Sequence, residues 1–251
     1  MKGNPLTGIG YFQRGLGSLT NPGLKRFIVL PLLLNIVLIG GASWWGIGEI
    51  SGWIDALVEW LPSWLSWLSW ILLPVAVLTL LVVLVYFFSA ILNLIASPFN
   101  GLLSEALETQ VTGQPLPQES LAATITRTLG RELRKLAYFI PRYLLLLVIS
   151  FIPVINLASP VLWFVFGAWV LTLQYLDYAM DNNGHSFADL HQALRKQPLT
   201  TLGFGFVVAI GFMIPVLNML VMPAAVCGAT LYWVEQLKQD FPKNIPSSQA
   251  T

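Results

Sequence analysis

The chain contains one motif twice, as Phe151-Ile-Pro-Val-Ile-Asn156 and as Met213-Ile-Pro-Val-Leu-Asn218. A second proline, Pro160 or Pro223, follows each copy, and each copy interrupts a long apolar block. Proline cannot continue a helix, whereas asparagine favours turns and satisfies freed backbone groups. We therefore predict that both blocks, residues 143–176 and 199–235, fold as helical hairpins of two short arms.

The length of each block decides how such a hairpin would sit in a membrane. A spanning helix needs about 20 residues at ~1.5 Å per residue, so each block is too long for one straight span and too short for two spans plus a turn. Arms that reach only part way across the bilayer need protein or a water-filled cavity around them, and such paired broken segments indicate a transport pathway. The alternative is a pair of full, tilted spans in each block.

The composition indicates an integral membrane protein that contacts the lipid bilayer. Of 251 residues, 56% are hydrophobic and only 10% are charged, and the mean hydropathy is +0.71. An average soluble domain carries about 25% charged residues. The net charge of +1 argues against a nucleic-acid partner. The single cysteine, Cys227, excludes a disulfide framework and a cysteine metal cage.

Residues 24–96 contain two further apolar segments, Phe27–Trp45 and Trp70–Ala96, each long enough for one full span, and we predict that both are full spans. Seven of the ten tryptophans lie between Trp44 and Trp70, which is typical of an aromatic belt at a membrane surface; a carbohydrate platform is the alternative. The segment 46–69 has no lysine or arginine, and the hairpin model places all thirteen basic residues on the opposite side. Both termini are therefore predicted to be cytoplasmic.

The remaining segments are predicted to be surface elements of a single membrane domain, residues 1–251. Residues 1–23 would form an amphipathic surface helix and a turn, with Ile9, Phe12, Leu16 and Leu19 on the helix's apolar face. Residues 97–142 would form cytoplasmic helices, in which Arg127, Arg131 and Arg134 contact lipid headgroups or form an electropositive funnel. Residues 177–198 would be a polar connection, and residues 236–251 a tail.

The junction between the first helix and the first span has the chemistry of an anion site. Asn21-Pro-Gly-Leu24 predicts a type II turn, and a helix that starts behind it presents free N–H groups. Gly23 allows close approach, and Lys25 and Arg26 add two positive charges where the helix dipole disfavours them. The site would comprise Gly23, Leu24, Lys25 and Arg26, whereas the alternative treats both cations as flanks of a span.

Four further polar residues are candidates for a pathway: Asn35, Glu105, Glu108 and Arg142. Polar groups within apolar segments are costly and usually face a cavity or a partner helix. Asn35 would either line a pathway or form a hydrogen bond to another helix. Glu105 and Glu108 would lie either at the mouth of a pore or on a face exposed to solvent. Arg142 would either take part in the pathway or extend its side chain to the membrane interface.

The motifs of catalysis are missing from the sequence. There is no Walker A loop, no Gly-x-Ser-x-Gly elbow and no zinc-ligand spacing around His185 and His191. We therefore predict that the chain is not an enzyme and binds no cofactor or metal.

Several segments together resemble the CysZ-type sulfate permeases of bacteria, in particular those of gamma-proteobacteria. The resemblance is carried by Gly17–Asn35, Tyr86-Phe-Phe-Ser89, Pro98–Glu105, Pro160-Val-Leu-Trp163, Gln174-Tyr-Leu-Asp177 and Met222–Thr230. It implies an all-α integral membrane protein with two full transmembrane helices and two partly penetrating, proline-broken helical hairpins, in a homo-oligomer. It also implies sulfate binding at Gly23, Leu24, Lys25 and Arg26, and a polar pathway near Asn35 and Glu105. Lys25 stands where the family more often has arginine, and lysine lacks the paired donors.

The resemblance implies sulfate uptake across the inner membrane for assimilatory reduction and cysteine synthesis, with sulfite as a further candidate substrate. The alternative is a membrane protein that senses sulfate or assists another permease without carrying flux itself. The sequence leaves open whether transport is channel-like or proton-coupled, the size of the oligomer and whether the chain inserts in one orientation.

Overall fold

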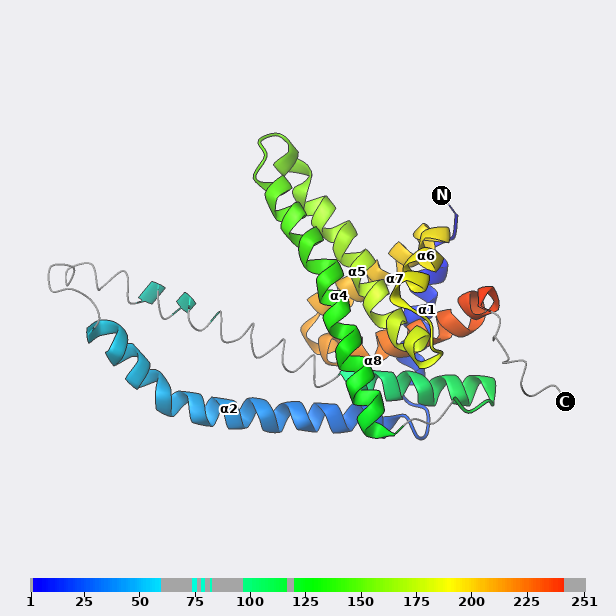
Figure 1. The fold of residues 1–251 in the computed structure, drawn as a ribbon, viewed down its shortest axis with the longest axis horizontal. Coiled ribbons are helices and arrows are strands. Elements are labelled where there is room, and N and C mark those ends of the chain that lie inside the picture. The colour runs from blue at the N-terminus through cyan, green and yellow to red at the C-terminus, as the bar shows by residue number, and fades with distance from the viewer. Residues whose placement is uncertain are drawn as a thin grey trace. The chain divides into compact units, whose positions relative to one another are not determined.

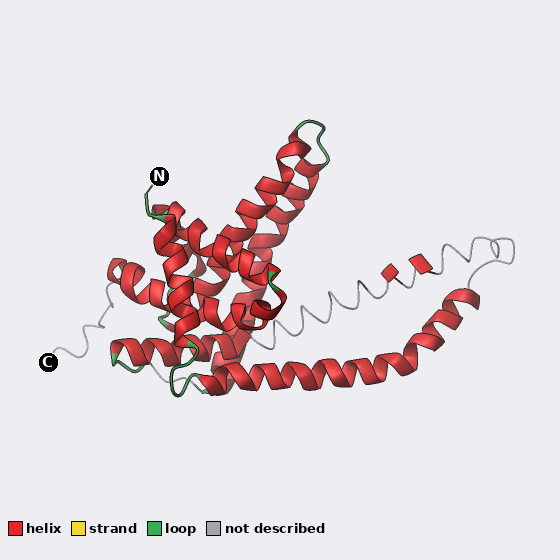
Figure 2. Ribbon diagram, turned by 180° about the vertical axis from the view of Figure 1, so that it is seen from behind, coloured by secondary structure: helices red, strands yellow, loops and turns green. Residues whose placement is uncertain are grey.

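The computed structural model describes residues 2–59, 74–75, 78–79, 82, 97–116 and 120–241. Within these ranges the chain is helical with short connections, and no strand occurs among them (Figure 2). The chain divides into two compact units, Val29–Ala96 and the combination of Met1–Ile28 with Ser97–Thr251. The prediction of an all-α fold is therefore confirmed for the described residues.

The Val29–Ala96 unit is described mainly through α2 (Lys25–Glu59), which begins just before it. This 35-residue helix contains the predicted span Phe27–Trp45 but continues past it, with Pro31 inside. At ~1.5 Å per residue it is about 52 Å long, which exceeds a membrane's hydrocarbon core. The helix therefore extends beyond the apolar segment into residues 46–59. The second predicted span, Trp70–Ala96, lies outside the described residues except at five positions.

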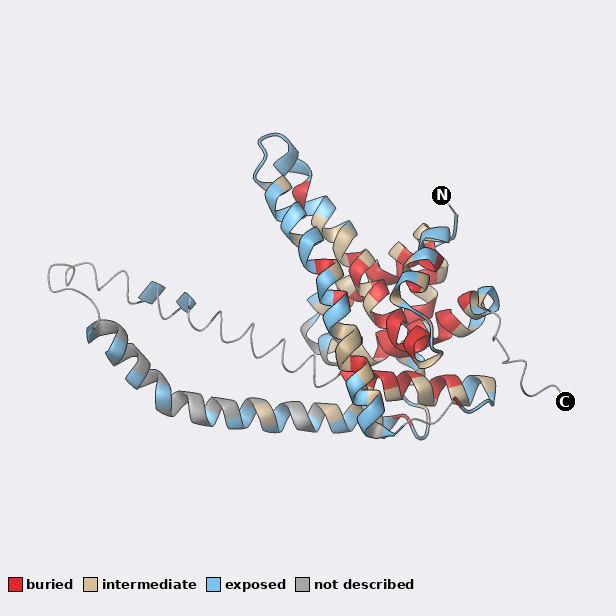
Figure 3. Ribbon diagram, viewed as in Figure 1, coloured by how far each residue is buried: buried red, intermediate tan, exposed pale blue. Residues whose placement is uncertain are grey.

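The larger unit is built around α1 (Pro5–Ser18), α5 (Ser159–Asn182), α7 (Pro198–Met213) and α8 (Pro215–Tyr232). These four helices contact one another, and most of the buried residues lie on them (Figures 1 and 3). Their core includes fully buried Phe204, Val208, Val226 and Leu173. A single apolar interior thus joins the N-terminal helix to the second half of the chain.

Helix α1 is not the surface-lying helix that its apolar residues predict. Its buried residues are Gly8, Tyr11, Phe12 and Gly15, and it packs against both α7 and α8. A side chain on Gly15 would overlap the backbone of Ala224 and Gly228, so the helices touch through main-chain atoms. The pattern of large apolar residues does not indicate this packing, because glycine buries a helix face by letting backbones approach closely.

Both copies of the repeated motif interrupt a helix at the predicted place. Helix α4 (Leu121–Ser150) ends directly before the first copy, and the 3-10 turn η2 (Ile155–Ala158) leads into α5. At the second copy α7 ends, Ile214 takes an extended conformation and α8 begins at Pro215. The helix breaks at the two motifs are therefore confirmed.

Helix α4 crosses a predicted boundary. The sequence predicts separate elements before and after residue 142, yet α4 continues through Pro141 to Ser150. Its outer half and the start of α5 lie side by side as an exposed hairpin (Figures 1 and 3).

Two helical stretches among the described residues are long and apolar enough to cross a membrane, Ile155–Asn182 and Leu220–Asp240, and Pro198–Met213 is a shorter apolar helix.

The segment predicted as a polar connection is partly helical. Residues up to Asn182 belong to α5, and α6 (Phe187–Lys196) follows after a short turn. Ser186 and Asp189 form a capping box at the start of α6, which explains why the helix begins there. After α8 the chain continues through the π-helical turn η3 (Trp233–Leu237) and the 3-10 turn η4 (Lys238–Asp240).

Candidate functional site

The turn before α2 has the conformation that its sequence predicts. Gly23 has a φ of +87°, which favours glycine, and the Leu24 N–H donates to the Asn21 carbonyl at 3.4 Å. The Leu24 side chain is fully buried in the core of the larger unit. Leu24 therefore anchors the turn through its side chain, while its own N–H already has a partner.

The two cations of the turn lie at the surface. Lys25 is the first residue of α2, and Lys25 and Arg26 are both exposed. The Arg26 guanidinium carbon lies 4.7 Å from the centre of the Phe27 ring, which is packed against the core. The first N–H groups of a helix have no partner within it. The start of α2, with the charges of Lys25 and Arg26, is thus anchored to the core by the buried Leu24 and the packed Phe27.

One side chain at this turn was not among the sequence-predicted residues. The Gln110 Nε2 donates a hydrogen bond to the Pro22 carbonyl at 3.0 Å, although the two residues are 88 positions apart. Gln110 is exposed near the end of the helical residues 97–112. No local pattern marks it in the sequence, because its role depends on which turn lies beside its helix.

Glu108 is not on a solvated face. It is fully buried, and its carboxylate accepts hydrogen bonds from Lys238 Nζ at 2.7 Å, Asn183 Nδ2 at 2.9 Å and Trp233 Nε1 at 3.3 Å. Glu105 lies one turn earlier and is partly exposed. Glu108 therefore ties the helix at 97–112 to the C-terminal turns η3 and η4.

Arg142 and Asn35 each lie within a long helix, α4 and α2 respectively. The Arg142 Nη1 donates to the Tyr138 carbonyl at 2.6 Å, and its guanidinium lies 3.5 Å from the centre of the Tyr138 ring. The backbone of Asn35 is helical within α2, in the other unit. The contacts described for Glu108 and Arg142 do not involve the turn at Gly23, where the four predicted site residues Gly23–Arg26 are consecutive.

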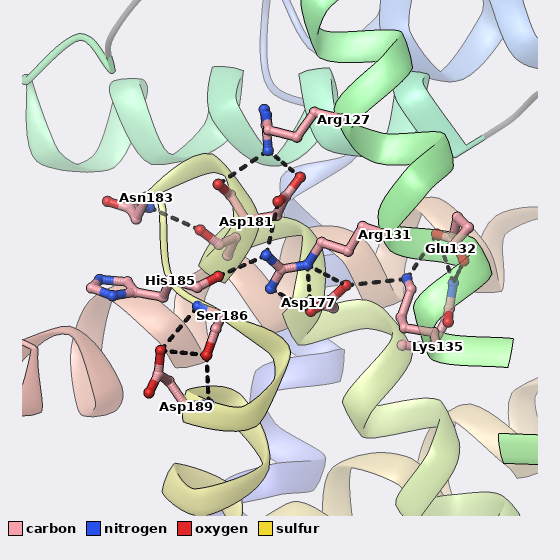
Figure 4. Close-up of polar contacts among 12 residues, drawn as sticks. Arg127, Arg131, Glu132, Lys135, Asp177, Asp181, Asn183, His185, Ser186 and Asp189 are labelled. Carbon is pink, nitrogen blue, oxygen red and sulfur yellow. Dashed lines mark hydrogen bonds and ion pairs between the residues drawn. The ribbon is translucent and has the colours of Figure 1, made fainter. Parts of the chain in front are cut away.

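A buried ionic network connects α4 to the inner end of α5 (Figure 4). The Arg131 guanidinium contacts the Asp177 carboxylate at 2.7 Å and that of Asp181 at 2.8 Å, and it donates to the His185 carbonyl at 2.7 Å. Arg127 also pairs with Asp181. Burial alone would lower the pKa of Arg131, but hydrogen bonds and charge from Asp177 and Asp181 hold that pKa above its usual value.

Lys135 extends the network into the protein interior. The residue is 1% exposed, and its Nζ lies 2.7 Å from Glu132 and 3.2 Å from Asp177. Desolvation would lower the pKa of Lys135, yet the neighbouring carboxylates raise it, so the ammonium stays charged. Three cations and three carboxylates balance: Arg127, Arg131 and Lys135 against Glu132, Asp177 and Asp181.

Both sequence interpretations of the arginine stripe are wrong for Arg131. Its side chain is 12% exposed and faces two carboxylates, so it is neither a lipid-headgroup contact nor part of an open funnel. Arg134 is exposed, as the stripe predicts. The missed signal was complementary spacing, since residues 127, 131 and 135 are basic, residues 177 and 181 are acidic, and side chains four apart share a helix face.

Uncharged polar groups continue this network toward the helix at 97–112. Ser97 Oγ donates to the Glu132 carboxylate at 2.6 Å, and Gln174 Nε2 reaches the same carboxylate at 3.3 Å. Asn100 Nδ2 donates to the Tyr178 hydroxyl at 3.4 Å.

Across the described residues, no group of three or more His, Cys, Asp or Glu side chains suits a metal ion.

Comparison with known proteins gives consistent results over nearly the whole chain. A family model described as "Sulfate transporter CysZ/Etoposide-induced protein 2.4" matches residues 11–223. A protein of Pectobacterium atrosepticum named "Sulfate transporter CysZ" is 46% identical over 96% of this chain and 90% of its own length. Proteins of the same name from Salmonella paratyphi A and Salmonella typhi are each 47% identical over 92% of this chain and 93% of their own length.

Proposed function

Since the chain belongs to the family of sulfate transporter CysZ and etoposide-induced protein 2.4, we propose that it carries sulfate into the bacterial cell across the inner membrane. The imported sulfate would supply assimilatory reduction and cysteine synthesis. Membership of this family also supports the prediction that the chain is not an enzyme. The observation that carries the proposal is the 46–47% identity to proteins named sulfate transporter over at least 92% of the chain.

The proposed sulfate site is the turn at Gly23, Leu24, Lys25 and Arg26. The turn at Gly23 leads into the start of α2, where N–H groups without a partner inside the helix and the helix dipole favour an anion. Lys25 and Arg26 are both exposed beside those donors. Leu24 would contribute by anchoring the turn in the core rather than by contacting the anion. Arg26 can donate two parallel hydrogen bonds to a tetrahedral oxyanion, whereas Lys25 supplies a point charge.

The broken hairpins would form the membrane part of the pathway. Helix α7 has 16 residues, or about 24 Å, which falls short of a hydrocarbon core of ~30 Å, whereas α8 continues into η3 and η4 and is long enough to cross it. The outer end of the α4–α5 hairpin exposes apolar Phe151, Val154 and Leu157, a surface suited to lipid. The proposal therefore keeps hairpins that penetrate the bilayer only part way, with α7 as the arm whose length supports it.

We also propose how the chain is oriented and assembled in the membrane. The basic residues Lys2, Lys25, Arg26, Lys196 and Lys238 favour cytoplasmic termini in a multi-pass inner-membrane protein. A homo-oligomer would shield the short arms from lipid. Glu105, Glu108, Arg142 and Asn35 are kept as pathway candidates, with Glu108 the one whose buried carboxylate is paired by a lysine.

Radiolabelled sulfate uptake into proteoliposomes tests the function and the site together. The wild type is expected to carry flux, and the Lys25→Ala/Arg26→Ala variant to lose most of it. The matched control is Lys2→Ala/Arg134→Ala, which removes the same charge from two exposed positions elsewhere in the larger unit. Equal flux in wild type and Lys25→Ala/Arg26→Ala would overturn the site. Sulfate binding without flux in the wild type would overturn transport and favour a sensor or accessory protein.

A further inference from the structure

Gln110 makes a long-range contact with the backbone of the proposed sulfate turn. Its Nε2 donates to the Pro22 carbonyl at 3.0 Å, and a Cβ placed on Gly23 would lie 3.4 Å from the same nitrogen. The amide group therefore lies against both residues that precede Leu24. Gln110 is exposed, as are Lys25 and Arg26, which follow the turn that it contacts.

The contact matters electrostatically because a carbonyl oxygen carries partial negative charge. At a turn that must attract an anion, the unpaired Pro22 oxygen would repel the ligand that the N–H groups attract. A primary amide has two N–H donors, and one of them already pairs with that oxygen. Gln110 thus offsets the one unfavourable dipole of the turn without adding a charge.

The helix that carries Gln110 is firmly held. Leu107 is 1% exposed in the core, and the buried Glu108 carboxylate bonds to Lys238, Asn183 and Trp233. A donor on such an element keeps its position better than one on a free loop. The turn is therefore fixed from two sides, by the buried Leu24 side chain and by the Gln110 amide.

We propose that Gln110 is a positioning residue of the sulfate site, which holds the Pro22 carbonyl and keeps the turn open to a divalent oxyanion. This inference rests on the proposed function. The role depends on a donor at position 110 and on the absence of negative charge there. The effect of a substitution at position 110 on sulfate binding should therefore depend on whether the new side chain donates a hydrogen bond and on its charge, rather than on its size.

The test compares Gln110→Met, Gln110→Glu and Gln110→Lys in the full-length protein, by sulfate binding in detergent and by uptake kinetics in proteoliposomes. Gln110→Met removes the donor at similar size and should raise the KM and Kd for sulfate about fivefold with an unchanged maximal rate. Gln110→Glu also adds negative charge and should raise both more than about tenfold. Gln110→Lys restores a donor and should bind sulfate at least as tightly as the wild type.

Gln13→Glu and Gln13→Lys are the matched controls, since Gln13 is exposed on α1. They should leave the KM unchanged. A merely structural role for Gln110 would lower thermal stability and maximal rate in all three variants without an order by charge, and that result would overturn the inference.

The outcome also separates this inference from the proposed function. If Lys25→Ala/Arg26→Ala abolishes sulfate binding while Gln110→Met and Gln110→Glu bind as the wild type does, only the role of Gln110 is wrong. If Lys25→Ala/Arg26→Ala binds sulfate normally, the turn is not the site, and both proposals fail.

Discussion

In the α4–α5 hairpin the two helices are joined by buried charges, whereas the α7–α8 hairpin is joined through glycine. Arg131 and Lys135 on α4 face Asp177 on α5 at 2.7 and 3.2 Å. On α7, by contrast, Gly211 leaves so little room that an added Cβ would lie 2.9 Å from the Val221 side chain of α8. On the outer side of α8, Gly228 packs against the backbone of Tyr11 in α1.

The Ile-Pro-Val motif and the helical arms on either side of it therefore have separate roles. The same Ile-Pro-Val sequence interrupts both helices, so the motif determines where each hairpin turns. Residues far from the motif determine what holds the arms. Helices that are held together by buried ion pairs depend on complete pairing, because an unpartnered buried charge is costly. A glycine join depends on shape, because closely packed backbones cannot move apart to admit a side chain.

The largest effect should come from breaking the ionic join. Asp177→Ala leaves Lys135 and part of the Arg131 guanidinium buried without their carboxylate, which should lower the free energy of unfolding by about 3–5 kcal/mol. Thermal unfolding in detergent, followed by circular dichroism, measures the change. The control is Asp240→Ala, which breaks an ion pair that is half exposed and should cost no more than ~1 kcal/mol. Equal losses in both variants would contradict an energetically important network.

A smaller effect is expected where α1 packs on α8 through glycine. Gly15→Ala places a methyl group against the backbone of Ala224 and Gly228 in α8 and should destabilise the protein by about 1–3 kcal/mol. Gly17→Ala is the matched control on the same helix, since a Cβ there meets nothing within 4 Å. Unfolding in detergent should show a lower midpoint only for Gly15→Ala. A neutral Gly15→Ala would mean that α1 is not closely packed on this hairpin.

The smallest effect should distinguish the two turns themselves. Val154 has a φ of +72°, which is strained for a β-branched residue, while Val216 lies at the start of α8 in regular helix. Val154→Gly should therefore stabilise the protein by up to about 1 kcal/mol, and Val216→Gly should destabilise it by up to ~1 kcal/mol. Opposite shifts of the unfolding midpoint are the expected result. Shifts of the same sign would show that the two copies have equivalent backbones.

Much of the helical layout followed from short stretches of sequence. The breaks at the two motifs and the turn at Gly23 were predicted, because proline and glycine restrict the backbone of their immediate neighbours. The boundary predicted at residue 142 was wrong. Pro141 lies inside α4, where the rest of the helix continues despite one missing donor. The helix therefore breaks where asparagine and a further proline follow the proline, and continues through the lone Pro141.

The candidate site was likewise predicted in part from short stretches of sequence. Lys25 and Arg26 were found from their charge at a helix start, and both are exposed as an anion site requires. The burial of Leu24, the pairing of Glu108 with Lys238 and the contact from Gln110 were not predicted. Each depends on residues that are distant in the chain, for which the sequence offers no local signal.

The sequence alone determined the class of protein, the broken helices and the positively charged turn, because composition, proline and adjacent charges act on nearby backbone. Only the tertiary structure decided which charges are neutralised and which stay exposed. Arg131 and Asp177 are 46 residues apart, and Gln110 and Pro22 are 88 apart. Whether such side chains meet depends on how whole helices pack, and that packing is set by the sum of many weak apolar contacts across the core.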